Sequence, residues 1–533
     1  MIPRPRRLGN SPAFLLGSAA FLGAFVVQSG DVGSADTARR LQTTHSFWTS
    51  APAVIRQDYP EFGVHGRNGK LYAWYGIGQS LLMLPADVVG TYLGKLPVFA
   101  GYHDTDPTVR DIFVSYSINI LITVLTALVC FRFLLLLGFN TKQAVAGGLA
   151  LLFCTTHLHY MQNMMENNHI LLLTLVGLKF DYEWLLNGNR RALFFGSVAF
   201  GLNLLTRLTT VLDLAAGGIF LALALWFQGA RGVEWRQRGV SFVKIAAPVY
   251  CFFLLLDRLY QYYRFGSFFN TYLSIVAREQ RRMDPSLPPN YPFETPFHVG
   301  FLGPLITPEK SIFLFDPLIV LTILLLVLAW KRFSPAIRAY LVSAFTLVLA
   351  YICFYARYTV WSGDSAWGDR YVSSAVELAA FISVPLLLRY RRVLGSWVAG
   401  AGAALIGISA LVQAASTAFW LPLERYQMET MEPPTWIVIL RFKNIAAFAL
   451  GKMDQWGLTN AAMKEDAWDY VHITTWNFLP AVLRRVGVVP GWVVDILLCV
   501  LAAALGTLIA VLWRLYVVTR NDGSSTSERS VSG

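Results

Sequence analysis

The sequence predicts an all-α polytopic membrane protein with about twelve transmembrane helices and with interfacial helices in long outer loops. Of its 533 residues, 55% are hydrophobic and only 14% are charged, and the charges lie between long apolar runs. A soluble chain of this size carries roughly a quarter charged residues and divides into several domains. A membrane-spanning helix needs ~20 mostly apolar residues, because unpaired backbone groups are too costly in hydrocarbon. The composition therefore favours a chain built mainly from spanning helices.

The apolar runs define the predicted spans and the division of the chain. Residues 1–420 are expected to form a transmembrane core, and residues 421–520 an outer loop with the last transmembrane helix. The Ser-rich end, 521–533, is expected to be a disordered cytoplasmic tail. The predicted spans are 12–29, 111–138, 142–160, 168–186, 192–207, 209–228, 240–262, 312–330, 338–357, 372–388, 393–419 and 490–516.

Basic residues in the short linkers predict the orientation. If the N-terminus is cytoplasmic, every short inner linker carries Lys or Arg, from Lys142 to Arg392, in agreement with the positive-inside rule. Both termini are then cytoplasmic. One apolar stretch, 72–93, would invert all later linkers if it crossed the membrane, so we expect a helix in the outer interface there. The loops expected outside are 30–110, 263–311, 358–371 and 420–489.

The net charge of +12 does not indicate a nucleic-acid partner. The basic residues mark the ends of apolar segments instead of forming one patch, which is the pattern of membrane topology signals. All five cysteines fall inside predicted spans, so neither a disulfide framework nor a zinc site is expected. The membrane is therefore the partner that the charge pattern supports.

Two carboxylates directly after the first span are the first candidates for chemistry. Asp31 and Asp36 lie in the segment S-G-D-V-G-S-A-D-T-A-R-R. A carboxylate held at the membrane surface near cations can act as a general base. Acidic residues are also ordinary just outside a span, and position alone favours that simpler interpretation.

A polar and aromatic loop between two spans is the second candidate. The segment W-S-G-D-S-A-W-G-D-R-Y ends with Trp367, Asp369, Arg370 and Tyr371. Aromatic faces can pack against a sugar ring, and the parallel N–H donors of an arginine guanidinium can bind phosphate oxygens. An interfacial aromatic belt is the alternative, because Trp and Tyr are enriched at the membrane surface.

Other polar residues lie near predicted helix ends. Lys310, just before a span, can meet a lipid phosphate or can simply extend to the interface. Glu166, Arg207 and Glu377 are ionisable groups near or inside spans, and such groups usually face a cavity or a partner. His169, at a helix start, is more often a residue of the cap than a ligand.

Four segments, in order, resemble the C-type glycosyltransferase superfamily and, within it, the bacterial protein-mannosyltransferase and aminoarabinose-transferase group. They are G-K-L-Y-A-W-Y-G-I-G-Q-S-L-L-M-L-P, F-G-L-N-L-L-T-R, the pair F-G-S-F-F-N-T-Y and L-I-T-P-E-K-S-I-F-L-F-D-P, and S-A-W-G-D-R-Y. The resemblance covers about residues 10–390. The adjacent Asp-Glu pair common in the superfamily is absent, and Lys310 stands where relatives carry Arg.

The resemblance implies a membrane enzyme of the bacterial inner membrane that takes a sugar from a polyprenyl-phosphate donor on the outer face. The acceptor is a lipid, a glycan or a protein. It implies that Asp36 or Asp31 is the base and that charged groups hold the leaving phosphate. The expected substrate-binding residues are Arg370, Lys310, Arg207, Asp369, Trp367, Tyr371 and Tyr72. Carboxylates are available for a divalent metal, but no spacing requires one.

Two other functions remain open from the sequence. A transporter or flippase of lipid-linked saccharides would show inverted repeats and broken helices at mid-depth, and no such repeat is found. A non-catalytic component of an envelope assembly is excluded only by activity measurements.

Overall fold

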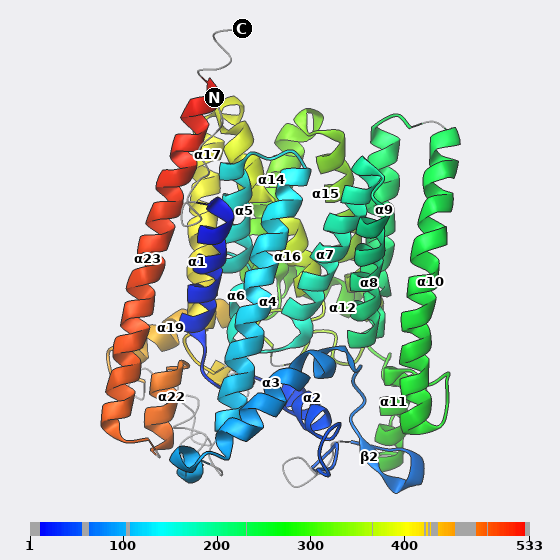
Figure 1. Ribbon diagram of the computed structural model, residues 1–533, viewed down its shortest axis with the longest axis vertical. Helices are drawn as coiled ribbons and strands as arrows, with labels where there is room; N and C mark the ends of the chain where they lie inside the picture. Colours follow the sequence, from blue (N-terminus) through cyan, green and yellow to red (C-terminus); the bar gives the residue numbers. More distant parts are fainter. Residues whose placement is uncertain are drawn as a thin grey trace.

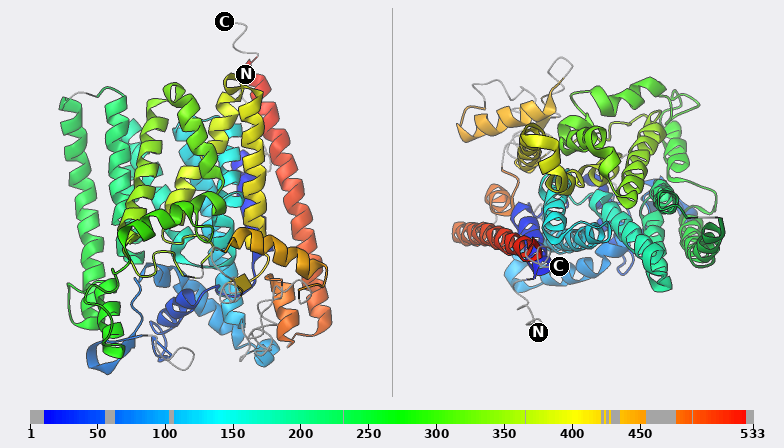
Figure 2. Two further views of the ribbon diagram at one scale, coloured as in Figure 1. Left: turned by 180° about the vertical axis from the view of Figure 1, so that it is seen from behind. Right: turned by 90° about the horizontal axis from the view of Figure 1, so that it is seen from above.

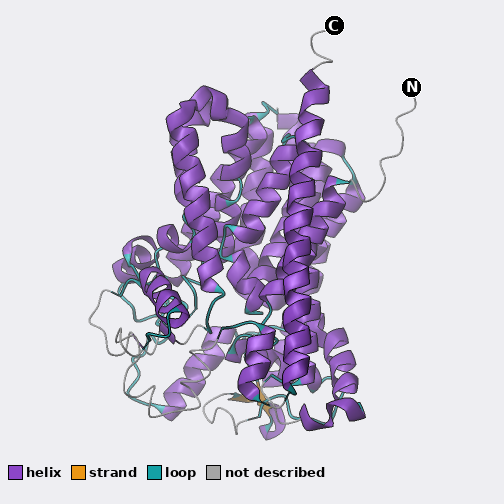
Figure 3. Ribbon diagram, turned by 90° about the vertical axis from the view of Figure 1, so that its left-hand side faces the viewer, coloured by secondary structure: helices purple, strands orange, loops and turns teal. Residues whose placement is uncertain are grey.

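The computed structural model describes residues 11–55, 63–102, 107–230, 232–364, 366–420, 423–424, 427, 435–453, 476–487 and 489–527. This part of the chain is a bundle of helices, as Figure 3 shows. A two-stranded antiparallel sheet pairs Val64 with Tyr72 and His65 with Leu71. The all-helical prediction is therefore confirmed, apart from this small hairpin.

The first part of the chain contains α1 (Pro12–Val27), α2 (Ala35–His45), β1 (Val64–His65), β2 (Leu71–Tyr72), α3 (Gly78–Gly94), α4 (Val109–Leu136), α5 (Thr141–Phe153), α6 (His157–Gln162), α7 (Glu166–Asn187) and α8 (Arg190–Thr206). The later elements are α9 (Val211–Phe227), α10 (Gly232–Phe265), α11 (Tyr272–Met283), α12 (Phe297–Ile306), α13 (Ile312–Phe315), α14 (Leu318–Ala329), α15 (Pro335–Tyr355), α16 (Ser373–Ala380), α17 (Ser383–Ser416), α19 (Ile437–Ala449), α22 (Leu479–Val486) and α23 (Gly491–Ser527).

The long helices run side by side, and α23 ends at the top of the bundle, the end toward which α1 begins (Figure 1). At the opposite end lie α2, α3, the hairpin, α11 and α22. Seen from behind, α19 lies across the direction of the long helices at this same end (Figure 2, orange). The described parts of the three long loops predicted to lie outside thus gather at one end, away from the termini. The orientation of the bundle in a membrane remains a prediction.

Six helical segments of the described chain are long and apolar enough to cross a membrane. Their bounds are Val109–Leu136, Leu208–Phe227, Gly232–Phe265, Pro335–Tyr355, Ser373–Ser416 and Gly491–Arg520. Each of the twelve predicted spans coincides with helical structure. Several of these helices are shorter than a full span, so the number twelve stays a prediction.

Local sequence signals set many helix ends. Thr108 and Asp111 form a capping box at the start of α4, in which each side chain binds the other residue's backbone N–H. The turn between α7 and α8 is short and also has local signals. Gly188 ends α7 with φ of 68°, and the next residue, Asn189, caps α8 through its side chain. These caps let neighbouring antiparallel helices follow one another closely.

Two predicted spans are interrupted in the core. The predicted span 142–160 ends as α5 at Phe153, and α6 starts at His157. The predicted span 312–330 is divided at Asp316, between α13 and α14. The two breaks meet, because Asp316 Oδ1 accepts the backbone N–H of Thr156 at 2.7 Å. The Thr156 hydroxyl also donates to Glu377 at 2.8 Å. The polar groups released by the breaks are thus paired across the core.

In three places the helix bounds add detail to the expected segments. The last helix, α23, continues to Ser527, beyond the start of the predicted disordered tail, because an established helix adds residues at little cost. The predicted spans 372–388 and 393–419 are joined in α17, where Gly395 (φ 85°) makes a kink. The stretch 72–93 contains helix α3 from Gly78 onward, at the end of the bundle away from the termini. Its place in an interface remains a prediction.

Candidate functional site

A cavity of about 310 Å³ lies at the end of the bundle away from the termini. Segments far apart in the sequence enclose it: α2, the stretch after β2, the start of α7, the turn between α8 and α9, α10, the end of α15 and the loop before α16. Four arginines and three carboxylates line it, so its wall carries excess positive charge. The polar and aromatic lining includes Asp36, Arg40, Tyr75, Glu166, Arg207, Asp257, Arg258, Gln261, Tyr355, Arg370 and Tyr371.

Asp36 is held in the first turn of α2 by two partners. Arg370 Nη1 lies 2.8 Å from Asp36 Oδ2, and the Tyr75 hydroxyl donates to Oδ1 at 2.5 Å. The helix that carries Asp36 starts at Ser34, whose hydroxyl accepts the backbone N–H of Thr37. These contacts fix the Asp36 side chain in place. It is still 27% exposed, so it can be reached from the cavity.

Glu166 joins two arginines on another wall of the cavity. Its Oε2 lies 2.9 Å from Arg40 Nη1, and its Oε1 accepts a hydrogen bond from Arg207 Nη1 at 3.2 Å. The side chains of Glu166 and Arg40 are only 8% and 4% exposed. One carboxylate thus holds two guanidinium groups that would otherwise repel each other in a poorly hydrated site.

Two of the arginines carry nitrogen atoms that lack an acceptor. Within the part of the chain that the structure describes, Nε of Arg40 and Nε of Arg370 are buried and donate no hydrogen bond. A buried charged donor without an acceptor is costly. Both residues line the cavity, where an anionic oxygen would meet guanidinium groups whose donors are not all paired.

Aromatic rings complete the cavity. Tyr355 and Tyr371 stack with ring centroids 4.3 Å apart, and the Arg207 guanidinium lies 5.4 Å from the Tyr371 centroid. The Arg40 guanidinium lies 4.2 Å from the centroid of Tyr75. Such cation–π contacts keep flat guanidinium groups in one orientation.

The segment that carries Tyr75 is fixed from two sides. Arg264, which is buried, donates to the Tyr75 carbonyl at 3.0 Å. Gly76 lies against the end of α8, where an added Cβ would come within 2.3 Å of the Leu205 carbonyl oxygen. Burial and the neighbouring Asp36 raise the pKa of Tyr75 well above its usual value, so its hydroxyl is a donor at neutral pH.

The loop before α16 presents Arg370 to the cavity, and Lys310 organises this loop. The Lys310 ammonium donates to the carbonyls of Asp364, Ala366 and Gly368, at 2.5, 2.8 and 3.1 Å. The Arg370 carbonyl accepts the Asn167 amide at 2.6 Å. Burial lowers the pKa of Lys310 from its ordinary value. Lys310 does not line this cavity, and loop carbonyls surround its ammonium; its predicted phosphate contact stays a prediction.

Four of the residues predicted from the sequence meet at the cavity: Asp36, Arg207, Arg370 and Tyr371. Asp31 does not line it; its carboxylate instead accepts the backbone N–H of Gly33 at 3.0 Å.

The remaining predicted residues support neighbouring structure. Trp367 is fully buried beside Phe315, with ring centroids 4.9 Å apart. Asp369 is buried, and its Oδ1 accepts the backbone N–H of Tyr371. Tyr72 lies on β2, with its ring 6.2 Å from that of Tyr263. None of these three lines the cavity.

The sequence prediction missed several residues that line the cavity. Arg40 is the clearest, and a signal for it exists. It follows Asp36 by four residues, a spacing that places both on one face of a helix. Glu166 attracted notice only as an ionisable residue at a helix start. Tyr75 lies inside a motif that carried the family resemblance, but nothing local indicated its contact with Asp36.

The described residues contain no group of three or more His, Cys, Asp or Glu side chains placed to hold a metal ion. The carboxylates around the cavity instead pair with arginines.

Among the comparisons with known proteins, the solved structures give matches. No family model and no curated protein matches the chain. Among solved structures, the chain is similar to the crystal structure of ArnT from Cupriavidus metallidurans bound to undecaprenyl phosphate. The identity is 14%, the TM-score is 0.41, and the match covers 96% of this chain and 78% of that one. At this TM-score the match carries no argument about function, which rests on the cavity itself.

Proposed function

We propose that the protein is a membrane glycosyltransferase that moves a sugar from a polyprenyl-phosphate donor to an acceptor hydroxyl in this cavity. The observation that carries the proposal is the set of buried arginines with unsatisfied donors around a fixed, accessible carboxylate. This pairing of groups suits a reaction in which a proton is removed and a phosphate leaves.

In the proposed reaction Asp36 accepts the proton of the acceptor hydroxyl. The hydroxyl oxygen then bonds to the anomeric carbon of the sugar as the bond from that carbon to the phosphate oxygen breaks. The polyprenyl phosphate leaves with the bonding electron pair and with added negative charge. Attack opposite the leaving group inverts the anomeric centre. Arg370 and Tyr75 hold the Asp36 carboxylate in place beside the cavity, where it can accept the proton.

The arginines serve the other half of the reaction. Phosphate gains charge as it leaves, and fixed cations at that point lower the barrier. We assign this role to Arg370, Arg207 and Arg40. Their guanidinium groups are already oriented by Asp36, Glu166 and the tyrosine rings, so little reorganisation is needed during the reaction.

An apolar groove adjoins the cavity and suits the lipid part of such a donor. It has a volume of about 330 Å³ and is lined from α8, the following turn, α9 and α10. It shares Leu204, Leu208 and Val211 with the cavity. A donor with its phosphate at the arginines can therefore lie with its first prenyl units between these helices. A further cavity beside α11 shares Thr271 and Leu273 with the candidate site. It offers the acceptor an approach separate from that of the donor.

The test is transfer from radiolabelled polyprenyl-phosphate sugars by the purified protein in lipid. Asp36→Asn should abolish transfer, while Asp31→Asn should retain it, because only Asp36 lines the cavity. Arg370→Ala should lower transfer by roughly 10²–10³-fold, the usual effect of removing one group that stabilises developing charge. Full activity of a folded Asp36→Asn variant would refute the assignment of the base. No transfer from any donor by wild type, together with flipping of the same lipid, would favour the transporter function.

A further inference from the structure

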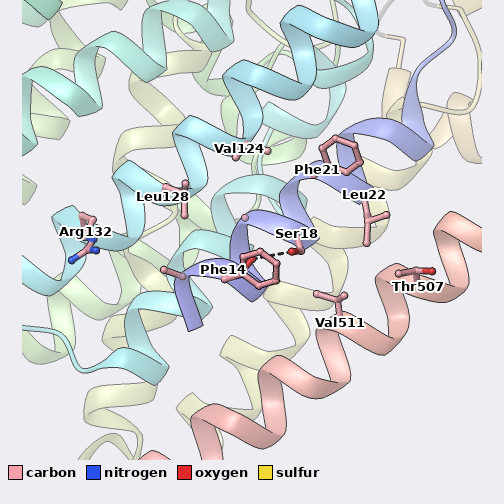
Figure 4. Close-up of a pocket in the computed structure, with 11 residues that line it drawn as sticks. Phe14, Ser18, Phe21, Leu22, Val124, Leu128, Arg132, Thr507 and Val511 are labelled. Atoms are coloured by element: carbon pink, nitrogen blue, oxygen red, sulfur yellow. Dashed lines mark hydrogen bonds between the residues drawn. The ribbon is translucent and has the colours of Figure 1, made fainter. Parts of the chain in front are cut away.

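A second apolar groove lies partway along the bundle, apart from the candidate site. Its volume is about 770 Å³, and α1, α4 and α23 enclose it (Figure 4). Its walls are almost wholly apolar and include Phe14 and Phe21 of α1, Val124 and Leu128 of α4, and Val511 of α23. No residue of the proposed glycosyltransferase site lines it.

One charged residue, Arg132, lies at one end of this groove. Val124, Leu128 and Arg132 follow each other at four-residue spacing along one face of α4 (Figure 4). Arg132 is exposed, and within the described chain its guanidinium has no hydrogen bond and no ion pair. It lies four residues before the end of α4 at Leu136, which is roughly 6 Å along the helix axis.

An unpaired arginine beside an apolar groove near the membrane surface requires an anion or water. Ionisable groups at such a depth usually meet a partner, and an arginine fork matches phosphate oxygens. We propose that the groove binds one anionic phospholipid. Its acyl chain lies between α1, α4 and α23, and its phosphate lies on Arg132.

The shape of the groove supports a chain-like occupant. Gly17 of α1 lines the groove beside Leu128, and a Cβ at Gly17 would be in van der Waals contact with Leu128, at 3.6 Å. A side chain longer than a methyl group at this position would therefore extend into the groove or displace Leu128. The helix α23 exposes most of its surface and meets α1 along this groove, so a bound lipid would help to hold it in place. The positive charge, set against apolar walls, favours a lipid over a second copy of the chain.

The test uses the full chain in a non-ionic detergent and counts bound lipids by native mass spectrometry. The probes are palmitoyl-oleoyl phosphatidylglycerol and palmitoyl-oleoyl phosphatidylcholine. Wild type should bind its first phosphatidylglycerol about five-fold more tightly than phosphatidylcholine, the effect of one basic residue near an anionic surface. Arg132→Gln should remove this preference, and Arg132→Lys should retain it.

Two further variants separate the groove from general charge. Gly17→Leu should weaken binding of both lipids, because it fills the space for the acyl chain. Arg191→Gln, an exposed arginine at the same end of the bundle on α8, should leave the preference unchanged. The proposal is overturned if Arg132→Gln keeps the preference, or if Gly17→Leu binds both lipids as wild type does. A lipid-free dimer that Gly17→Leu dissociates would also overturn it, in favour of a second copy as the occupant.

Discussion

Replacing Glu166 with Gln should destabilise the protein and disorder one wall of the cavity. Glu166 is the shared partner of Arg40, at 2.9 Å, and of Arg207, at 3.2 Å. Glutamine keeps the shape and one acceptor oxygen but loses the negative charge. The two guanidinium groups then face each other without compensation in a site where Glu166 and Arg40 are nearly buried.

The size of the effect follows from this burial. Removing one partner of a buried ion pair typically costs about 3–5 kcal/mol, because the other charge stays buried and unpaired. Arg207 retains 17% of its exposure and can turn partly to water, so we expect a value near the lower limit, about 3 kcal/mol. Transfer activity should fall as well, because both arginines are assigned to the leaving phosphate.

A matched control lies on the same helix. Glu183 pairs with Lys179 one turn away near the other end of α7, and both side chains are partly exposed. Such a pair contributes only about 0.3–0.5 kcal/mol. Thermal unfolding in detergent, followed by intrinsic fluorescence, should therefore show a large loss for Glu166→Gln and almost none for Glu183→Gln. Equal losses in the two variants would refute the reasoning.

Three further changes test neighbouring contacts. Tyr75→Phe removes a hydrogen bond to a charged carboxylate, so transfer should fall on the order of ten-fold, while Tyr72→Phe, outside the cavity, should have no effect. Gly76→Ala drives a Cβ against backbone of α8 and should cost about 1–3 kcal/mol in thermal unfolding, whereas Gly101→Ala meets open space and should be neutral. Burial raises the pKa of Asp369 from 3.8 to about 7, so the folded state holds the proton more tightly than the unfolded state. Stability should therefore fall as pH rises from about 4 to about 7, and a series of melting curves on Asp369→Asn should show a flatter dependence. An equally steep dependence in that variant would contradict the shift.

The helices were predictable because their signals are local. A run of apolar residues long enough for a membrane must form its own backbone hydrogen bonds, whatever it packs against. For this reason all twelve predicted segments coincide with helical structure. The breaks at Thr156 and Asp316 were not predicted, because each is stabilised by a side chain from the other segment, 160 residues away.

The candidate site was predictable only in part. The motifs contained Asp36, Arg207, Arg370 and Tyr371, which the structure brings to one cavity. They also contained Lys310, whose charge before a span matched a phosphate ligand equally well. The three carbonyls that surround its ammonium belong to residues 364, 366 and 368, and no local pattern indicates that contact.

By itself, the sequence determined a helical membrane protein and the approximate positions of its long apolar helices, and it predicted one orientation for them. Hydropathy and charge act on each segment separately, so they can be read without knowing the neighbours. Only the tertiary structure decided which polar groups meet. Asp36 and Arg370 are 334 residues apart in the chain, yet their side chains lie 2.8 Å apart. Their contact depends on how α2 lies relative to the loop before α16. The attraction between two charges is strong only at short distance, so it acts after the rest of the fold has brought the two backbones together.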